Sequence, residues 1–395
     1  MRNTMKRLAL IVTLGFGSAL IAHAQYTVTL LQPSGFTASE GHGISGSKEI
    51  GWGTVGGSQH GLIWSGTAAS FLDLNPAGAS QSFLNGISGS KEIGYATFAG
   101  ADHSMLWSGT AASALDLNPA GFSSSHGRAI SSANQVGDGV NGSGSTHALL
   151  WSGTAASVVD LHPLSGFTSS QAFATSGANQ LGFGTTIFGQ NHGLLWNGTA
   201  ASVVDLNPAG FTETYAAGMS GTTQVGTGWG SATSNRNHAI LWNGTAASAV
   251  DLNPSGWLSS QAWSSSGGVQ TGWAWNSNVT FDFHAYIWSG TAASGINLYN
   301  FLPANYTTSL AFGVDSTTGN IVGMAHNGTL NRDEAVMWSA VPEPSSLVAF
   351  GILTIGLIRR RRPAQVVSVT SIWASRICSP IFVLRVNWDS AIFHD

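Results

Sequence analysis

The chain has 395 residues, enough for a large folded core, and only 8% of them are charged. It contains 51 glycines and 15 tryptophans, a mixture typical of short strands joined by Gly-rich turns and packed on buried aromatics, and unlike that of disordered chains. Residues 26–340 carry five basic and fifteen acidic side chains, a formal charge of −10, which excludes a basic nucleic-acid-binding surface. Cys378 is the single cysteine, so the chain has no intrachain disulfide.

The first 24 residues have the pattern of a signal peptide. A basic start precedes an apolar stretch, Leu8 to Ala22, and Ala22-His23-Ala24 is a small-x-small cleavage site. Signal peptidase would therefore leave a mature chain that begins at Gln25. The alternative is an uncleaved N-terminal membrane anchor, but the short apolar core and the well-placed Ala-x-Ala site favour cleavage.

Residues 25–340 repeat one unit seven times. A block that reads His-Ala-Leu-Leu-Trp-Ser-Gly-Thr-Ala-Ala-Ser at residues 147–157 recurs almost verbatim, and its tryptophan marks each unit. These tryptophans are Trp64, Trp107, Trp151, Trp196, Trp242, Trp288 and Trp338. Their successive spacings of 43, 44, 45, 46, 46 and 50 residues match the length of a four-stranded propeller blade.

Each unit divides into four expected strands. In the third complete unit they cover residues 127–131, 135–139, 147–151 and 157–161, with a recurrent Val-Gly in the second. Ser-Gly or Asn-Gly follows the first six tryptophans and predicts a tight turn there. An Asn-Pro pair in four units then ends the fourth strand, because proline cannot donate to a ladder.

The seventh unit lacks its fourth strand, and the mature N-terminus can supply it. After Trp338 the chain runs directly into a different kind of sequence, whereas residues 27–36 align with residues 202–211 of the fourth unit. The sequence therefore predicts an all-β, seven-bladed β-propeller of four-stranded blades in which the N-terminal strand completes the last blade. A β-solenoid or a sandwich array is the alternative, but a solenoid usually has atypical capping repeats.

Two polar residues recur with the repeat. A histidine stands four residues before six of the tryptophans, at His60, His103, His147, His192, His238 and His284, and Glu334 takes the seventh place. An aspartate recurs at Asp73, Asp116, Asp160, Asp205 and Asp251, with Asn297 in the sixth unit. A ring of metal or anion ligands is one interpretation, but equivalent positions on different blades lie too far apart for one ion, so hydrogen bonds within each blade are favoured. Turn capping is likewise favoured for the aspartates over a catalytic pair or a calcium site.

Residues that break the repeat are better candidates for a ligand site, because blade-specific loops usually carry a propeller's function. The sixth unit has four tryptophans close in sequence: Trp257, Trp263, Trp273 and Trp275. Exposed, they could stack on sugar rings; packing in the core is the alternative and the more common role. The sequence predicts no catalytic residues, no metal ligands and no cofactor.

The C-terminal part contains three features in order. Val341-Pro342-Glu343-Pro344-Ser345 comes first, an apolar run from Leu347 to Ile358 follows, and Arg359, Arg360, Arg361 and Arg362 end it. The apolar run would enter the membrane and the arginines would stay in the cytoplasm, although the run is short for a full span of about 20 residues.

These features closely resemble the PEP-CTERM sorting signal of Gram-negative bacteria over about 22 residues. The resemblance implies recognition by an exosortase, a membrane transpeptidase that depends on a cysteine, with processing near Pro-Glu-Pro. It also implies an exopolysaccharide-producing host. The chain departs from the family after the arginines, because residues 363–395 follow where such proteins normally end. This tail is a read-through product or a cytoplasmic extension, and if it blocks processing the protein would stay in the inner membrane.

The repeats also resemble the HAF family of extracellular repeats. The family pattern of Val-Gly, His-Ala-x-x-Trp and Asp-Leu reads here Val136-Gly137, His147 to Trp151, and Asp160-Leu161, with Leu or Ile usually in place of Phe. The resemblance covers nearly all of residues 26–340 and implies an exported repeat protein, without an agreed biochemical activity.

The sequence thus predicts a signal peptide (1–24), a propeller (25–340), a sorting signal with a short transmembrane segment (341–362) and a tail (363–395). The protein would pass from an inner-membrane intermediate to the cell surface or the extracellular space. The favoured function is a non-enzymatic binding component of the cell surface or exopolysaccharide matrix. A polysaccharide hydrolase or lyase at the channel mouth is the alternative, and a structural spacer is a third possibility.

Overall fold

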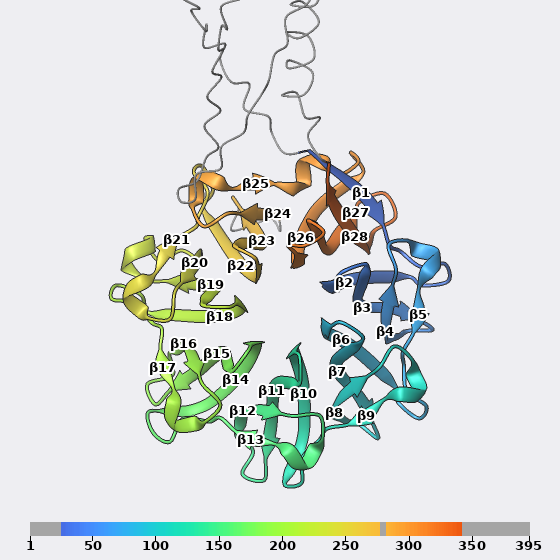
Figure 1. Ribbon diagram of the computed structural model, residues 1–395. Coiled ribbons are helices and arrows are strands. Elements are labelled where there is room, and N and C mark those ends of the chain that lie inside the picture. Colours follow the sequence, from blue (N-terminus) through green and yellow to red (C-terminus); the bar gives the residue numbers. More distant parts are fainter. Residues whose placement is uncertain (1–24, 277–281, 342–395) are drawn as a thin grey trace, which may run out of the picture. The chain divides into compact units, whose positions relative to one another are not determined.

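A computed structural model describes residues 25–276 and 282–341 and shows seven four-stranded antiparallel sheets arranged as blades around a centre (Figure 1). The predicted seven-bladed propeller is therefore confirmed. Blades 1 to 3 comprise β2(Ala38–Ser45) to β5(Leu72–Asp73), β6(Gln81–Ser88) to β9(Leu115–Asp116), and β10(Phe122–Ser131) to β13(Val159–Asp160). Blades 4 to 6 comprise β14(Phe167–Ser176) to β17(Val204–Asp205), β18(Glu213–Ser220) to β21(Val250–Asp251), and β22(Ser259–Ser266) to β25(Ile296–Asn297).

The second and third strands form the middle of each blade in blades 1 to 6. They are β3(Lys48–Val55), β4(Ser58–Trp64), β7(Lys91–Phe98), β8(Ala101–Trp107), β11(Asn134–Asn141), β12(Thr146–Trp151), β15(Asn179–Thr186), β16(Asn191–Trp196), β19(Thr223–Trp229), β20(His238–Trp242), β23(Val269–Trp275) and β24(Phe283–Trp288). Short 3₁₀ turns join elements at η1(Ala68–Ser70), η2(Ala111–Ser113), η3(Ala155–Ser157), η4(Ala200–Ser202), η5(Ser231–Thr233), η6(Ala246–Ser248), η7(Ala292–Ser294) and η8(Leu298–Phe301).

Blade 7 closes the ring with strands from both ends of the propeller. Its sheet has the order β1-β28-β27-β26, from β1(Tyr26–Leu30), β28(Arg332–Ala340), β27(Asn320–Asn327) and β26(Tyr306–Asp315). Tyr26 is the partner of Ala340 and Leu30 is the partner of Val336, so β1 is the outermost strand of the last blade, as predicted. Figure 1 shows this seam where the first strand lies beside β27 and β28. No open blade edge is left between the first and last blades.

The repeated tryptophan fills the space between blades. Trp64, Trp107, Trp151, Trp196, Trp242, Trp288 and Trp338 are all fully buried. A second repeated contact joins neighbouring blades: a buried Ser or Thr hydroxyl of one innermost strand accepts a hydrogen bond from a backbone N–H in the preceding blade. The same bond crosses the seam, where Ala335 N–H donates to Ser39 Oγ at 2.9 Å. The contact between blades 7 and 1 therefore has the same hydrogen bond as the contacts between all the other neighbouring blades.

After each of the first six tryptophans the glycine has a positive φ, as in a tight turn, but a 3₁₀ turn follows before the fourth strand. In blade 3 a 3₁₀ turn occupies Ala155–Ser157, and the fourth strand shrinks to Val159–Asp160 instead of residues 157–161. Ser157 Oγ donates to Thr154 O at 2.6 Å and accepts from Ser152 N–H at 2.8 Å, which holds the turn. The outer strands of blades 1 to 6 are thus two residues long, too short to template pairing with another sheet.

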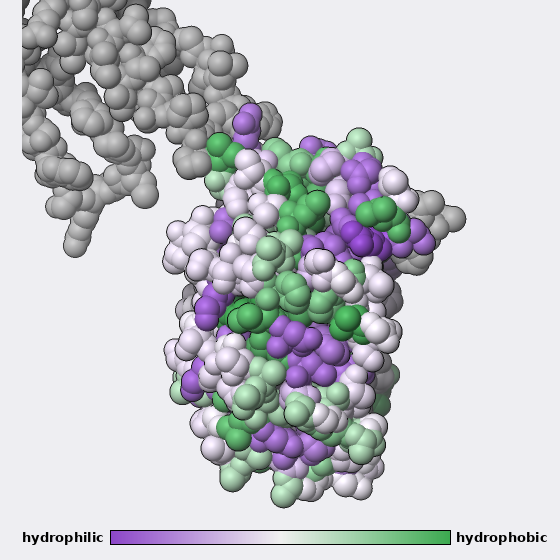
Figure 2. Space-filling view, turned by 90° about the vertical axis from the view of Figure 1, so that its right-hand side faces the viewer, coloured by the Kyte–Doolittle hydropathy of each residue, from purple (hydrophilic) through white to green (hydrophobic). Residues whose placement is uncertain are grey.

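The outside of the ring mixes apolar and polar side chains. Leu72 and Leu115, on the outer strands of blades 1 and 2, are about half exposed, and each directly precedes an aspartate. Figure 2 shows hydrophobic and hydrophilic patches alternating down this side of the ring. No single chemistry dominates this side of the ring.

Candidate ligand-binding site at the channel mouth

Each innermost strand has a β-bulge at the same place, where one residue has no partner in the second strand. The seven bulged residues are His42, Asn85, Arg128, Phe173, Ala217, Trp263 and Phe312. All seven line a central cavity of about 530 Å³. A bulge re-aims its side chain, so the residue at this position reaches the channel, and its identity differs from blade to blade.

Glycine in the second strand makes the bulge possible. A Cβ added at the glycine facing each bulge would lie 1.8–1.9 Å from a carbonyl oxygen of the innermost strand. These glycines are Gly51, Gly94, Gly137, Gly182, Gly226, Gly272 and Gly323. This close approach explains the recurrent Val-Gly of the sequence, because any side chain there would collide with backbone.

The residue after each bulge is small because the innermost strands of adjacent blades converge there. It is Gly43, Gly86, Ala129, Ala174, Gly218, Ser264 or Gly313. A Cβ on Gly218, for example, would lie 2.4 Å from the carbonyl oxygen of Trp263 in the next blade. The small residues bring the strands close around the axis and leave the bulged side chains to define the channel.

Aromatic rings cover one arc of the channel, from blade 6 to blade 1. The Trp263 and Trp273 rings lie 5.8 Å apart, and both make edge contacts with Phe312, at 6.0 and 5.7 Å. Phe312 stacks in turn on His42, with centroids 4.7 Å apart and an interplanar angle of 4°. Trp52 Nε1 donates to His42 Nε2 at 3.2 Å, so this imidazole is held on both its face and its edge.

The arc continues into blade 2 through Trp52. Its ring makes an edge contact with Phe83 at 5.8 Å, and Phe83 stacks on Tyr95 at 4.8 Å. Glu40 Oε2 lies 3.1 Å from His42 Nε2. Nε2 can accept from the Trp52 indole or, in the tautomer that carries a hydrogen there, donate to Glu40, but it cannot do both at once.

Blade 3 contributes a charged cluster instead of an aromatic pair. His126 Nδ1 lies 3.0 Å from Asp138 Oδ2, and its Nε2 lies 3.1 Å from Asp102 Oδ2 of blade 2. Arg128 Nε donates to Asp138 Oδ1 at 2.9 Å, and the guanidinium lies over the Phe173 ring, 5.2 Å from its centroid. The cluster fixes a cation at the channel wall in contact with an aromatic face.

Burial and charge act in opposite directions on the pKa values of this cluster. Burial alone would lower the pKa of His126, but its hydrogen bonds to Asp138 and Asp102 and the charge of Asp138 raise it above the ordinary value. Burial alone would raise the pKa of Asp138, but His126 and Arg128 lower it. The arrangement therefore favours an imidazolium between two carboxylates, with Asp138 ionised.

The remaining wall is aromatic in blade 4 and open in blade 5. Phe173 and Phe183 lie 5.6 Å apart, and Phe183 makes an edge contact with Tyr215 at 5.0 Å. At the bulge of blade 5 the lining residue is only Ala217, the smallest of the seven. The channel wall is therefore asymmetric, with its widest side over blade 5.

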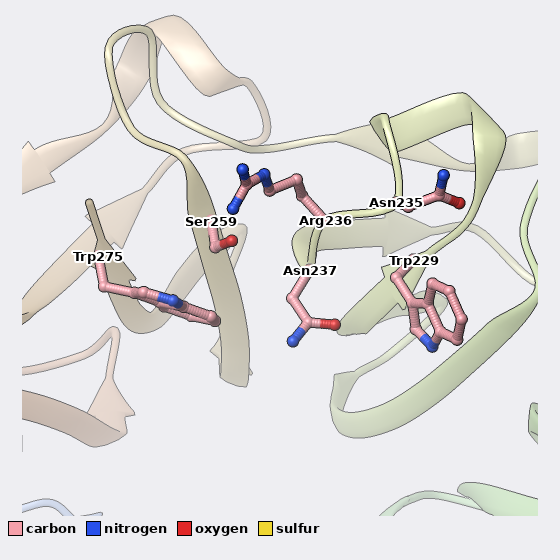
Figure 3. Close-up of a pocket in the computed structure, with 6 residues that line it drawn as sticks. All are labelled: Trp229, Asn235, Arg236, Asn237, Ser259 and Trp275. Carbon is pink, nitrogen blue, oxygen red and sulfur yellow. The ribbon is translucent and has the colours of Figure 1, made fainter. Parts of the chain in front are cut away.

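A second pocket, of about 330 Å³, lies between blades 5 and 6. Trp229, Asn235, Arg236, Asn237, Ser259 and Trp275 line it. In Figure 3 the two indoles lie on opposite sides of Asn237, and the Arg236 side chain extends from its loop toward Ser259. Trp229 ends β19, Ser259 begins β22 and Trp275 ends β23, so the pocket is built by strand ends and the β19–β20 loop.

The recurrent histidines and aspartates lie away from the channel, in pairs across the third and fourth strands. In blade 3, His147 Nδ1 lies 2.7 Å from Asp160 Oδ2, and Asp160 Oδ1 accepts from His162 N–H at 2.8 Å. Blades 1, 2, 4 and 5 have the same pair. In blade 6, Asn297 Nδ2 bonds His284 Nδ1 at 2.9 Å, and in blade 7 Glu334 accepts from the Tyr306 hydroxyl. Within the described ranges, no three His, Cys, Asp or Glu residues are grouped so as to hold a metal ion.

The four tryptophans of the sixth unit are divided among three places. Trp263 lines the channel, Trp273 is buried against it, and Trp275 lies in the pocket between blades 5 and 6. Trp257 packs against Tyr286 at 5.5 Å and His284 at 5.0 Å, in the position that blades 1, 3, 4 and 5 fill with phenylalanine. Ligand contact by these residues stays a prediction.

Sequence reasoning missed most channel residues, among them His42, Arg128 and Phe312. One pattern in the repeats could have identified them. In each unit, a residue whose type varies is followed directly by Gly, Ala or Ser and stands six residues or more before the Val-Gly. Unless the bulge is known, however, the alternation of side chains along a strand does not predict that this side chain points to the channel axis. The pocket between blades 5 and 6 has no comparable signal.

Comparison with known proteins identifies the C-terminal signal. Residues 340–362 match the family described as the PEP-CTERM protein-sorting motif. The motif implies processing by exosortase and marks the chain as an exported, membrane-passing and surface-sorted protein of Gram-negative bacteria. The predicted transmembrane segment, the arginine cluster, the signal peptide and the tail lie outside the described residues. In the part that is described, no helix is long and apolar enough to cross a membrane.

Solved structures share the fold at low sequence identity. The β-propeller domain of the Trilobed protease from Pyrococcus furiosus is 13% identical, with a TM-score of 0.50 over 80% of this chain and 94% of that one, and is described as having an open velcro topology. Oligogalacturonate lyase from Vibrio parahaemolyticus is 10% identical, with a TM-score of 0.51 over 80% and 94%. A puromycin hydrolase is 9% identical, with a TM-score of 0.52 over 82% of this chain and 58% of that one. At such identities the likeness concerns the fold alone, and no curated protein matches the sequence significantly.

Proposed function

We propose that this protein is a non-enzymatic, surface-sorted binding component of the exopolysaccharide matrix, and that its ligand enters the channel mouth. One observation supports the proposal above all. The scaffold repeats almost verbatim, yet the bulged position, which lines the channel in all seven blades, carries a different kind of side chain in most of them. The HAF-like repeat pattern fits the same role.

The chemistry of the wall suits a polysaccharide. Flat faces of Trp263, Phe83 and Phe173 offer apolar surface to sugar rings, and Arg128 and Asn85 offer hydrogen-bond donors. Asn85 Nδ2 already donates to Gly127 O at 2.7 Å, so it is pre-positioned and only one of its hydrogens is committed. The sorting motif would deliver this surface to the compartment where exopolysaccharide accumulates.

A channel-filling substitution tests this proposal. Ala217→Trp adds a large side chain at the widest side of the wall without removing a contact, so binding to isolated exopolysaccharide should fall at least about 10-fold. Leu164→Ala, at a residue exposed over 83% of its surface, is the matched control and should bind as the parent does. Co-sedimentation of purified protein with matrix fractions measures both. Failure of the parent protein to bind any fraction would favour a structural spacer.

A hydrolase or lyase is the second candidate, and the cluster of Asp102, His126, Arg128 and Asp138 motivates it. These groups break the sevenfold pattern and contact one another beside the channel, which Arg128 lines. Both nitrogens of His126 are occupied by carboxylates, however, which leaves neither free to take a proton from a substrate. We expect no new reducing or unsaturated ends when the protein is incubated with polysaccharide. Cleavage that His126→Ala abolishes would establish the enzyme instead.

A further inference from the structure

The pocket between blades 5 and 6 has a chemistry distinct from the channel. Its wall combines two indoles, two carboxamides, one hydroxyl and the Arg236 guanidinium, and none of its six lining residues is acidic. This is notable in a propeller with only five basic side chains against fifteen acidic ones.

The loop that carries Arg236 is built specifically in blade 5. Eight residues, 230–237, separate β19 from β20, whereas two separate β3 from β4 in blade 1. Ser234 and Asn235 both have positive φ, at 54° and 57°, a conformation that costs energy outside glycine. The buried Thr233 hydroxyl donates to Arg236 O at 2.6 Å and holds the backbone of the turn.

Neighbouring groups fix the other walls. Asn237 O accepts from Ser260 N–H at 2.8 Å, which ties the loop to the innermost strand of blade 6. Trp229 Nε1 donates to Glu213 Oε2 at 3.4 Å, and Trp275 makes an edge contact with Phe283 at 5.5 Å. The pocket is therefore positioned before a ligand arrives, which lowers the entropy cost of binding.

We infer that this pocket binds an anionic sugar unit, such as a uronate, of an extracellular polysaccharide. This deepens the proposed function and rests on it, because it names the ligand class of a polysaccharide-binding propeller. The indole faces suit the apolar faces of pyranose rings, and the guanidinium and the amides of Asn235 and Asn237 suit a carboxylate and its neighbouring hydroxyls. A volume of about 330 Å³ is at the small end of ligand pockets, which fits a short stretch of glycan.

Charge decides between this ligand and a single-stranded nucleic acid, which could also stack on the indoles. A nucleic acid brings a phosphate with every base, whereas a polysaccharide can carry a single uronate among neutral sugars. One arginine in a stretch of formal charge −10 can pair with one carboxylate but cannot neutralise several phosphates. At 0.15 M salt the screening length is about 8 Å, so the repulsion from distant carboxylates fades while a direct bond to Arg236 persists.

Calorimetry with the full chain in detergent tests the inference. The probes are hexamers of galacturonate, mannuronate and glucuronate, the carboxyl-reduced neutral form of each, and a deoxythymidine hexamer. We expect at least one uronate hexamer to bind about 10-fold or more tightly than its neutral form. Arg236→Gln should remove this preference while leaving the affinity for the neutral form unchanged, and Trp275→Ala should weaken both about 10-fold.

The matched control is Lys91→Gln, which removes the same charge from an exposed position in blade 2 and should change nothing. Melting temperatures of the variants establish that each is folded. The inference is overturned when no uronate is preferred over its neutral form, when the preference survives Arg236→Gln, or when the deoxythymidine hexamer binds most tightly. If Trp263→Ala at the channel abolishes glycan binding while the pocket variants do not, the proposed function stands and this inference falls.

Discussion

At the scale of single residues, this protein separates structural from variable positions sharply. The repeated Trp151 is fully buried between blades, and the repeated His147 bonds Asp160 at the periphery. The side chains that reach the axis, such as Arg128 and Trp263, have no counterpart in other blades. Repetition therefore marks what the fold needs, and departure from repetition marks the side chains that line the candidate site.

The charged cluster of blade 3 should make stability depend on pH. Since His126 has a raised pKa, its protonation contributes stability that is fully present below the ordinary value of 6.5 and is lost as pH rises through the folded-state pKa. Asp138 has a lowered pKa, so its contribution is present above the ordinary value of 3.8 and is lost as pH falls through the folded-state pKa.

We therefore expect His126→Gln to reduce the free energy of unfolding more at pH 5.5 than at pH 8.5. Urea denaturation at both pH values measures the two differences. His60→Gln is the control, because that residue forms the outer pair with Asp73 in blade 1 and is not part of this cluster. An equal loss at both pH values for His126→Gln would show that the imidazole is not held as a cation.

At the scale of elements, the β-bulge links the sequence pattern to the channel. Each bulge places a carbonyl oxygen over a glycine of the second strand, so bulge and glycine depend on each other. This pairing explains why the glycine of the Val-Gly pair recurs inside the second strand, where strand propensity alone would disfavour it.

Gly137→Ala should consequently be far more damaging than its size suggests. The added Cβ would lie 1.8 Å from the carbonyl oxygen of His126, so the bulge must shift, and we expect a loss of about 3 kcal/mol. Gly142→Ala in the next turn is the control, since its Cβ has no neighbour nearer than 3.9 Å and its loss should stay within about 0.5 kcal/mol. Denaturant midpoints compare the two, and similar values would argue against the bulge.

At the scale of the whole molecule, closure depends on one five-residue strand. Leu31 N–H donates to Ala335 O and Val341 N–H donates to Gln25 O, each at 2.8 Å, so the ends of the seam are fixed on both sides of β1. Gln25 and Val341, at the two ends of the described propeller, consequently lie beside each other at this seam.

Proline substitutions in β1 test the seam. In an antiparallel strand alternate N–H groups point the same way, so Thr29, like Leu31, directs its N–H at β28, and Leu30 directs its N–H away. Thr29→Pro should cost about 2 kcal/mol or more and expose the edge of β28 to self-association. Leu30→Pro, at an exposed edge position, should cost less. Thermal melting and size-exclusion chromatography report both effects, and equal behaviour of the two variants would contradict this closure.

The sequence by itself determined the number of blades, the closing strand and the sorting signal. They appear in the sequence as a repeat, as a strand that the last unit lacks, and as a motif with its parts in order. Trp spacing gave the period, and residues 27–36 supplied the strand that the last unit lacks. These features are local in sequence, so pattern and turn chemistry are enough to find them.

Only the tertiary structure decided which residues share a site. His42 and Phe312 are 270 positions apart in the chain, yet their rings stack at 4.7 Å, because ring closure makes blades 7 and 1 neighbours. Strand alternation cannot foresee a bulge that turns one side chain to the axis, and the loop that carries Arg236 meets Trp275 only through blade packing. Contacts between blades depend on the ring as a whole, which no single repeat contains.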